Sequence, residues 1–571
     1  RPNARKRNGA AAVSARRPRP RRKCAGTGTW LALRALQWGN VQHFWKQLAW
    51  TLGASVVLCA LLMGLGVWMT PPWKVEPLDE HISPSSSNTA IEAKGIHTTT
   101  EGKYKVRETH RTLTVSGGRQ VDAILREPIG APGKLPAVQF IHGAGTGDAT
   151  TNSDIAHALA SAGIVTLVQS KRLDDYSMLH RDYEASATDY LTGINTLRSL
   201  PNVDANKVGI YAESEGTWIT TLITKRDPSI AFTVLVSAPV FSARQQMAVG
   251  ATEYLHIIGA PEGVEGIVPK MLSLNPGMLG LEYASFNAAD YRNTLTMPLL
   301  VVYGTLDRSM PVEQGAQQLL QDANSVGNTN TMVRYYPTNH QIRLGSSLSK
   351  PGLPLPDQYT HDIESWVSAV AAGATAGDWT TPKIAGSQPF QQFAVPTDIR
   401  PGLITSFNVL VAMFVFIVLM WVVTVVLCIA SHLGRKKRAH VSTDANGRTL
   451  MHRFTKQTQT LIVTNIVLAP IITLGFLAYF VFTAVSALNL QDHATALSIG
   501  WVGLRVATVI SVALLCWLWV RMFFFYGPGR LDADEPEPEA RMARGHCAIV
   551  ACLSVCVLVA LALGVFFNLI S

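Results

Sequence analysis

The sequence VGIYAESEGTWITTL, residues 208–222, predicts the fold of the central part of the chain. Its first residues form an apolar run with the length of a buried strand, and a helical pattern follows from Gly216. Ser214 stands between them among small residues, which a tight strand-to-helix turn requires because neighbouring backbone crowds it. A serine in this position is a candidate nucleophile. Ala212 departs from the glycine that usually opens this motif, and similar strings also occur by chance.

Strand-like and helix-like segments alternate on both sides of this stretch. The apolar runs with the length of strands are 137–141, 164–168, 208–211, 232–236, 299–303 and 332–336, and helical patterns lie between most of them. This alternation predicts an α/β fold, with a mostly parallel sheet and helices on both faces. In such sheets the functional groups gather at the carboxyl ends of the strands, so the loops after the strands are the place to look.

Two further candidate residues directly follow strand-like runs: Asp307 after residues 299–303, and His340 after residues 332–336. A serine hydroxyl needs a base to become nucleophilic, and the base needs an acid that orients it. The order Ser214, Asp307, His340 is the order of α/β-hydrolases, and it differs from the order in chymotrypsin or subtilisin. The alternative interpretations are an aspartate that caps a helix and a histidine in a surface loop.

The turn after residues 137–141 supplies candidates for an oxyanion hole. We expect one donor to be the backbone N–H of Ala144, and the other to be that of Glu215, the residue after the serine. His142, Gly143 and Gly216 are predicted to support these turns. His142 is interpreted as a structural residue and not as a second base.

The seven cysteines all lie outside residues 74–400. The central region therefore contains no thiol nucleophile, disulfide or cysteine metal site. No metal and no cofactor are expected.

Residues 105–370 resemble the serine α/β-hydrolase superfamily, with closest similarity to bacterial hydrolases of the dienelactone-hydrolase and serine-aminopeptidase-like groups. The matching segments are 140–145, 171–172, 200–204, 208–210, 212–218, 234–239, 303–307 and 339–340. The resemblance implies hydrolysis through a covalent acyl-Ser214, with His340 as base and then acid and Asp307 orienting it. Residues 169–176 lack the usual glycine-rich continuation, which leaves specificity open.

Two features near the candidate site allow alternative interpretations. Residues 240–297 lie where this fold often inserts a cap, which could be an apolar lid over an acyl pocket or ordinary helix packing. Glu213 and Glu215 flank the serine. They could bind a cationic substrate group, or form salt bridges to Lys171 or Arg172.

Five apolar stretches are long enough to cross about 30 Å of hydrocarbon. They are residues 48–69, 404–431, 461–488, 496–520 and 547–570, and their only charged residue is Arg505. With 48% hydrophobic and 15% charged residues, the chain is neither disordered nor a purely soluble protein. We expect transmembrane helices and a lipid membrane as partner. Arg505 could mark a functional site or extend to the membrane surface.

Positive charge is concentrated beside these stretches. Residues 1–47 carry twelve Lys and Arg and no acid, and residues 435–456 carry seven more. Because positively charged loops stay on the cytoplasmic side, we expect a multi-pass protein with a cytoplasmic N-terminus and an extracytoplasmic central domain. The spacer-rich and disulfide-free character of that domain suggests a bacterial plasma membrane. The region 74–400 holds 25 basic and 32 acidic residues, and nucleic acid is not expected as a partner.

The expected domains are a basic arm (1–47), an uncleaved anchor (48–69), a stalk (70–100), an α/β-hydrolase-like domain (101–372), a linker (373–403) and an all-α membrane domain (404–571). The predicted function is a membrane-anchored serine hydrolase that cleaves an ester, thioester or amide of a small-molecule, acyl or peptidyl substrate. One alternative is a transporter or assembly protein whose hydrolase-like domain only binds a ligand. Another is a serine aminopeptidase.

Overall fold

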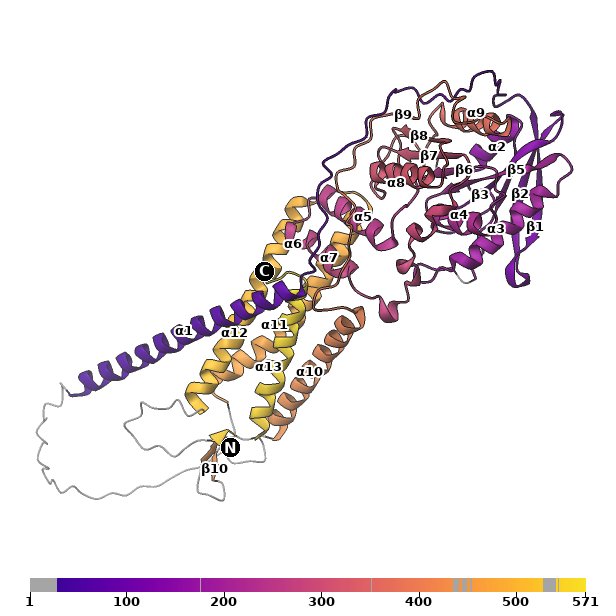
Figure 1. Cartoon of the computed structure of the whole chain (residues 1–571). Coiled ribbons are helices and arrows are strands. Elements are labelled where there is room, and N and C mark those ends of the chain that lie inside the picture. Colours follow the sequence, from indigo (N-terminus) through magenta and orange to yellow (C-terminus); the bar gives the residue numbers. More distant parts are fainter. Residues whose placement is uncertain are drawn as a thin grey trace, which may run out of the picture.

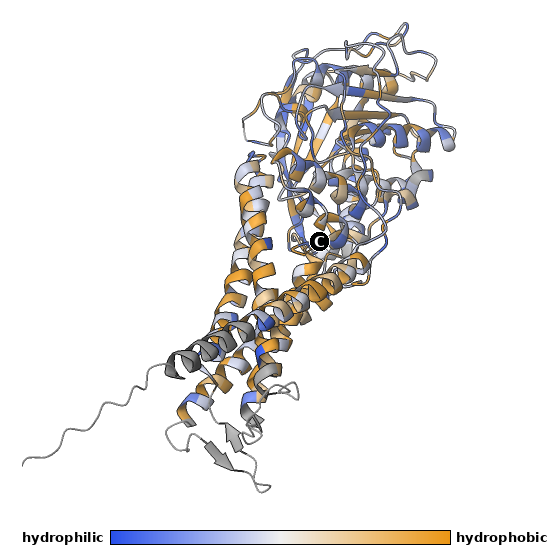
Figure 2. Ribbon diagram, turned by 90° about the vertical axis from the view of Figure 1, so that its left-hand side faces the viewer, coloured by the Kyte–Doolittle hydropathy of each residue, from blue (hydrophilic) through white to orange (hydrophobic). Residues whose placement is uncertain are grey.

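The computed structural model describes residues 28–174, 176–350, 352–434, 441–443, 449–451, 454–526, 541–542 and 544–570. Figure 1 shows a domain built on a large sheet at one end and a group of long helices at the other. The long helices are dominated by hydrophobic residues, whereas hydrophilic and hydrophobic residues are mixed in the sheet domain (Figure 2).

Nine strands form the sheet in the order β1-β2-β4-β3-β5-β6-β7-β8-β9. Strands β1, β2 and β4 pair antiparallel, and all the pairs from β4 to β9 are parallel, which confirms the mostly parallel sheet. The strands are β1 (Lys105–Thr114), β2 (Gln120–Ile129), β3 (Leu135–Ile141), β4 (Val165–Gln169), β5 (Val203–Glu213), β6 (Thr233–Val236), β7 (Leu299–Gly304), β8 (Thr331–Tyr336) and β9 (Ile384–Gly386).

Helices cover both faces of this sheet and bury a core on each. Along β5, Ile210 faces one core with helices α3 (Tyr183–Arg198), α4 (Glu215–Arg226) and α8 (Val312–Ser325), whereas Tyr211 faces the other. The second core contains residues of α2 (Ser153–Ser161) and α9 (Tyr359–Ala371). Successive residues of a strand point to opposite faces, so a strand covered on both sides is apolar throughout.

The segments expected to be a stalk and a linker are packed against each other. Figure 1 shows them running side by side along the sheet domain. Pro77 pairs with Phe393 and Ala93 with Trp379 in antiparallel bridges, and β9 of the second segment extends the sheet. Free flexible segments are therefore the wrong description, because backbone hydrogen bonds to each other and to the sheet hold both of them.

Within the described residues, five helices are long and apolar enough to cross a membrane: Phe44–Met69, Phe407–Leu433, Lys456–Leu488, Ala494–Phe523 and His546–Phe566. They belong to helices α1 (Gly28–Met69), α10 (Phe407–Gly434), α11 (Lys456–Leu488), α12 (Ala494–Tyr526) and α13 (Arg544–Phe566). Helix α1 begins well before the expected anchor. A small sheet joins β10 (Val441–Thr443), β11 (Thr449–Met451) and β12 (Arg541–Met542). Residues 1–27 of the basic arm and the cluster 435–438 lie outside the described residues.

The insertion between β6 and β7 lies between the sheet and the long helices. It contains α5 (Ala243–Ile257), α6 (Glu262–Glu265), α7 (Ile267–Leu272) and three 3₁₀ turns (Gly277–Leu279, Glu282–Ser285 and Ala288–Thr294). Val264 and Ile267 pack with Trp501 of α12, and the Lys270 ammonium donates to Asn568 Oδ1 at 2.6 Å, just past α13. We call residues 240–297 the cap. The cap packs against both the long helices and the sheet domain, and these contacts match the interpretation of the segment as ordinary helix packing.

The buried Trp366 of α9 yields a stability prediction. Its ring meets the Phe232 ring edge to face with centroids 5.9 Å apart. We expect Trp366→Ala to lower the free energy of unfolding by about 3–5 kcal/mol, since it leaves a cavity in the core. In a thermal melt of the full chain in detergent, followed by near-UV circular dichroism, this corresponds to a Tm lower by roughly 10 °C. Ile129→Ala, at an exposed position, serves as the control, and a Tm equal to the control would contradict the prediction.

Candidate active site

Ser214 occupies a sharp turn between β5 and α4. Its φ of 51° and ψ of −122° lie outside the usual regions for a residue with a side chain, which marks local strain. The Ser214 N–H donates to Val236 O at 2.8 Å and fixes the turn against β6. A Cβ on Gly216 would come within 2.6 Å of Ile141 O, so only glycine lets α4 start this close to β3.

The structure brings the three residues that follow strands β5, β7 and β8 into one hydrogen-bonded chain. His340 Nε2 lies 2.8 Å from Ser214 Oγ, and His340 Nδ1 lies 2.6 Å from Asp307 Oδ2. The carboxylate can only accept a hydrogen bond, so Nδ1 carries the proton and Nε2 is free to accept from the serine hydroxyl. This is the arrangement in which a serine can lose its proton to an imidazole.

The electrostatics of the pair favour a charged carboxylate beside an imidazole. Burial opposes ionisation of Asp307, but His340 and Ser309 outweigh it and hold the pKa of Asp307 below its usual value. Burial likewise lowers the pKa of His340, yet the Asp307 carboxylate outweighs that effect and raises it above the ordinary value. The imidazole is thus a stronger base than a free histidine.

Sequence reasoning missed the groups that hold this pair in place. The N–H and hydroxyl of Ser309 donate to Asp307 Oδ1 at 2.8 and 2.6 Å. Ser237, in a left-handed conformation after β6, donates its hydroxyl to His340 O at 2.7 Å. The available signal was a serine two residues after an aspartate, a spacing that often forms a local turn.

The turn after β3 lies beside the serine. A Cβ on Gly143 would lie 3.1 Å from Ser214 Cβ, and the next residue, Ala144, is exposed. His142 is buried, and its Nε2 lies 2.9 Å from Gln169 O. Burial is the main reason that the pKa of His142 falls to about 4, so its ring is neutral near pH 7. These contacts agree with a structural role for His142.

The Glu215 carboxylate is the centre of a second cluster, at the start of α4. It accepts hydrogen bonds from Lys171 (3.2 Å), Arg181 (2.6 Å), Tyr176 (2.8 Å) and Tyr183 (2.9 Å). Burial opposes ionisation, but the two cations and two hydroxyls hold the pKa of Glu215 below its usual value. Of the two interpretations of this glutamate, the structure matches the salt bridge.

The other residues considered for that cluster have separate partners. Glu213 Oε2 accepts from Asn152 Nδ2 at 3.0 Å. Arg172 donates to Asp189 at 2.8 Å and pairs with Asp174 at 3.8 Å. Tyr176, Arg181 and Tyr183 were not anticipated, because they reach Glu215 from more than 30 residues away.

One known protein family matches the part of the sequence that holds this arrangement. The family described as BAAT / Acyl-CoA thioester hydrolase C terminal matches residues 189–347, which include Ser214, Asp307 and His340. No curated protein matches the sequence significantly.

Three solved structures illustrate the similarity. A protein named as a dienelactone hydrolase from Klebsiella pneumoniae subsp. pneumoniae MGH 78578 has 14% identity and a TM-score of 0.32, covering 47% of this chain and 100% of its own. Porphyromonas gingivalis dipeptidyl peptidase 4 has 15% identity and a TM-score of 0.32, covering 48% and 36%. The 2,6-dihydroxy-pseudo-oxynicotine hydrolase has 15% identity and a TM-score of 0.32, covering 49% and 71%.

The sheet order, the strand-to-helix turn at Ser214 and the family match agree with the resemblance found in the sequence. The chain therefore contains a domain with the α/β-hydrolase fold that matches a hydrolase family over residues 189–347, and the described part of the chain also holds five helices long and apolar enough to span a membrane.

Proposed function

We propose that the protein is a membrane-anchored serine hydrolase with Ser214 as nucleophile, His340 as general base and Asp307 as orienting acid. The observation that carries the proposal is the continuous hydrogen-bonded chain from Ser214 Oγ through the imidazole to the buried carboxylate. In the first step Ser214 Oγ bonds to the substrate carbonyl carbon while its proton moves to His340 Nε2. The leaving group takes that proton, and water then hydrolyses the acyl-serine.

The developing oxyanion would be held by backbone donors, namely the N–H groups of Glu215 and Ala144. Glu215 is the first residue of α4, so its N–H lies at the positive end of the helix dipole. Lys171 supports this geometry, because its ammonium contacts both Glu215 and Gly143 O, the latter at 2.5 Å. It thereby ties together the two turns that would supply the donors.

The substrate class is an acyl ester or thioester, with an amide as the alternative. The matching family is named for acyl-CoA thioester hydrolases, which supports acyl chemistry. The Porphyromonas gingivalis structure is that of a dipeptidyl peptidase, so a peptidase that releases N-terminal residues is the second candidate. A panel of acyl esters and aminoacyl amides separates the two.

The ends of the long helices support the proposal that the sheet domain lies on one side of the membrane, together with the end of α1, the start of α10, the connection between α11 and α12, and the end of α13. The end of α1 and the start of α10 meet where Leu403 N–H donates to Trp68 O at 3.0 Å. His493, between α11 and α12, donates its N–H to Ile258 O of the cap, and Asn568 after α13 binds Lys270. All these ends lie beside the sheet domain or its cap, as the charge pattern requires for a cytoplasmic N-terminus and an extracytoplasmic domain in the plasma membrane.

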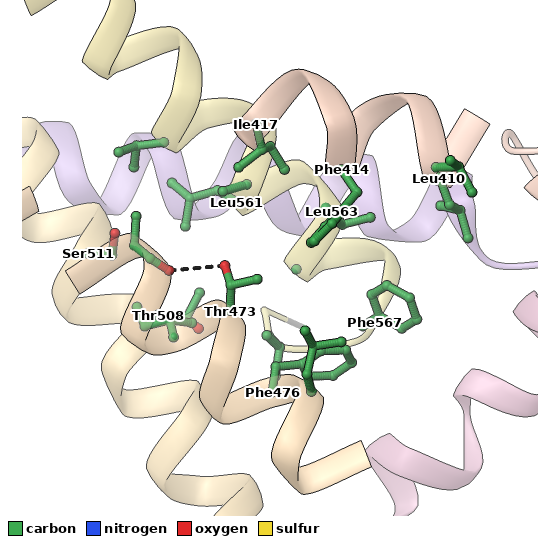
Figure 3. A pocket seen from close by; sticks show the side chains of 18 of the residues that line it. Leu410, Phe414, Ile417, Thr473, Phe476, Thr508, Ser511, Leu561, Leu563 and Phe567 are labelled. Atoms are coloured by element: carbon green, nitrogen blue, oxygen red, sulfur yellow. Dashed lines mark hydrogen bonds between the residues drawn. The ribbon is translucent and has the colours of Figure 1, made fainter. Parts of the chain in front are cut away.

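The cavity among the long helices has an apolar lining that does not suit the passage of ions. It measures about 340 Å³, and Figure 3 shows mostly apolar side chains of α10, α11, α12 and α13 around it. The hydroxyls of Thr473 and Thr508 donate to carbonyls of their own helices, to Ala469 O at 3.0 Å and Leu504 O at 2.8 Å. A conduit for charged solutes needs polar groups that face the path, so this cavity gives the transporter alternative no support.

The nucleophile is tested by labelling. We expect a fluorophosphonate probe to label the wild-type chain on Ser214, and Ser214→Ala to lose both the label and esterase activity, since the attacking oxygen is absent. Mass spectrometry of the labelled peptide identifies the site. Ser199→Ala, at an exposed serine just past the C-terminal end of α3, is the control and should label like the wild type. Equal labelling of Ser214→Ala would refute the proposal.

The raised pKa of His340 predicts the pH dependence. The reaction needs the neutral imidazole, so kcat/KM falls as the pH decreases through the pKa of His340, which lies above its ordinary value near 6.5. In Asp307→Asn the imidazole loses the carboxylate that raises its pKa, and burial then dominates. We expect the acid limb to move to lower pH and kcat to fall by about 10⁴-fold. An acid limb that stays in place would contradict the assignment.

The Glu215 cluster predicts a stability effect. Glu215→Gln leaves the buried Lys171 and the partly buried Arg181 without their carboxylate, which costs about 3–5 kcal/mol. Thermal melts of the full chain measure it as a lower Tm. Glu184→Gln is the matched control, because its partner Arg226 and its own carboxylate are near the surface, where such a pair contributes less than about 1 kcal/mol. Equal Tm values for the two variants would show that the cluster does not hold the turn.

A further inference from the structure

A loop beside the candidate site reaches toward the long helices. Tyr176, in the loop between β4 and α3, accepts from the Gly145 N–H at 3.0 Å and donates to Glu215 at 2.8 Å. Two residues later the chain reaches Met178 and Leu179, which are 80% and 51% exposed. The same short loop thus contacts the turns around Ser214 and presents apolar side chains to the outside.

The cap holds this loop on its other side. Leu281 N–H donates to Leu179 O at 2.8 Å, and the Tyr283 hydroxyl donates to Met178 O at 3.0 Å. The Arg181 guanidinium lies over the Tyr283 ring, 4.4 Å from its centroid. These contacts place Met278, which is 69% exposed, on the segment that fastens the loop.

That cap segment is bound to the first turn of α10. Met278 N–H donates to Asn408 Oδ1 at 2.9 Å, and Asn275 exchanges backbone hydrogen bonds with the chain at residues 405 and 407, at 2.8 and 3.0 Å. Figure 1 shows this segment descending from the sheet domain to the end of α10. The exposed apolar face of α10 begins at Val409. Met278 therefore lies at the level where the candidate membrane span starts.

Trp68 is a second marker of the level at which the candidate membrane spans meet the sheet domain. Trp68, near the end of α1, is 73% exposed, and its carbonyl is bonded to the Leu403 N–H just before α10. Tryptophans are enriched at the boundary between lipid and water. The ends of two candidate spans and the exposed methionine thus lie at one boundary, with the hydrolase domain on its polar side.

We propose that Met178, Leu179 and Met278, here called the apolar lip, insert into the lipid surface that faces the hydrolase domain. The domain would then draw substrates with long acyl chains from that surface to Ser214. This inference rests on the proposed function and names its substrate class. The occupant is lipid because the lip is continuous with the start of a membrane span and consists of flexible apolar side chains without charge.

The test compares two esters that share a leaving group. The full chain is reconstituted in phosphatidylcholine vesicles and assayed with p-nitrophenyl butyrate from solution and with p-nitrophenyl palmitate carried in the same vesicles. For Met178→Asp/Met278→Asp we expect hydrolysis of the palmitate to fall at least about tenfold, the order that burial of one apolar side chain contributes to a partition equilibrium. Hydrolysis of the butyrate should stay within a factor of about two, since the site is unchanged.

Two controls accompany this variant. Ile129→Asp introduces one such charge at an exposed apolar residue, the last of β2, and Figure 1 shows β2 on the part of the sheet domain distant from α10; this variant should hydrolyse both esters like the wild type. Met178→Leu/Met278→Leu keeps the lip apolar and should retain the palmitate rate.

The outcomes separate this inference from the proposed function. If Ser214→Ala still hydrolyses the butyrate, the proposed function fails. If Ser214→Ala is inactive while the lip variant cleaves the palmitate at the wild-type rate, only the lip inference is overturned, as it would be if the lip bound a protein partner. A wild-type chain that cleaves the butyrate but not the palmitate would likewise overturn the substrate class.

Discussion

The candidate site depends on one backbone constraint, the reversal of the chain within a single residue at Ser214. Strand β5 must end and α4 must begin without an intervening loop, and the serine accepts a positive φ to achieve it. Close packing on β3 enforces the turn, because Gly216 leaves no room for a side chain there. Both neighbours of the serine are anchored, Glu213 by Asn152 and Glu215 by its four partners. The strain is thus distributed over a rigid surrounding structure.

The sequence identified the residues whose position follows from strand ends. Ser214, Asp307 and His340 each come directly after a buried strand, and in a parallel sheet these ends share one edge. Apolar length alone was likewise sufficient for the five long helices, although α1 starts earlier than its apolar part. In both cases a local pattern determines the result, so no knowledge of distant contacts was needed.

The rest depends on partners that a local pattern does not specify. The expected stalk and linker are polar and rich in proline and serine, which is typical of flexible segments, yet Pro77 and Phe393 pair across more than 300 residues. Val264 and Ile267 of the cap are buried, but the periodicity of the sequence does not reveal whether such residues cover a substrate pocket or pack with Trp501. Arg181, in the loop before α3, and Tyr183, the first residue of α3, reach Glu215 because of the path that this loop takes.

The meeting of Trp68 and Leu403 has an architectural consequence. Because the polypeptide leaves α1 and returns to α10 at the same place, the whole hydrolase domain is a loop whose two ends touch. Removing everything between these ends would require only a short junction to reconnect two neighbouring helices. The sheet domain is in this sense an insertion between two neighbouring long helices, and the contacts of its cap with α12 and with Asn568 after α13 are the further joints that an exchange of either part would have to rebuild.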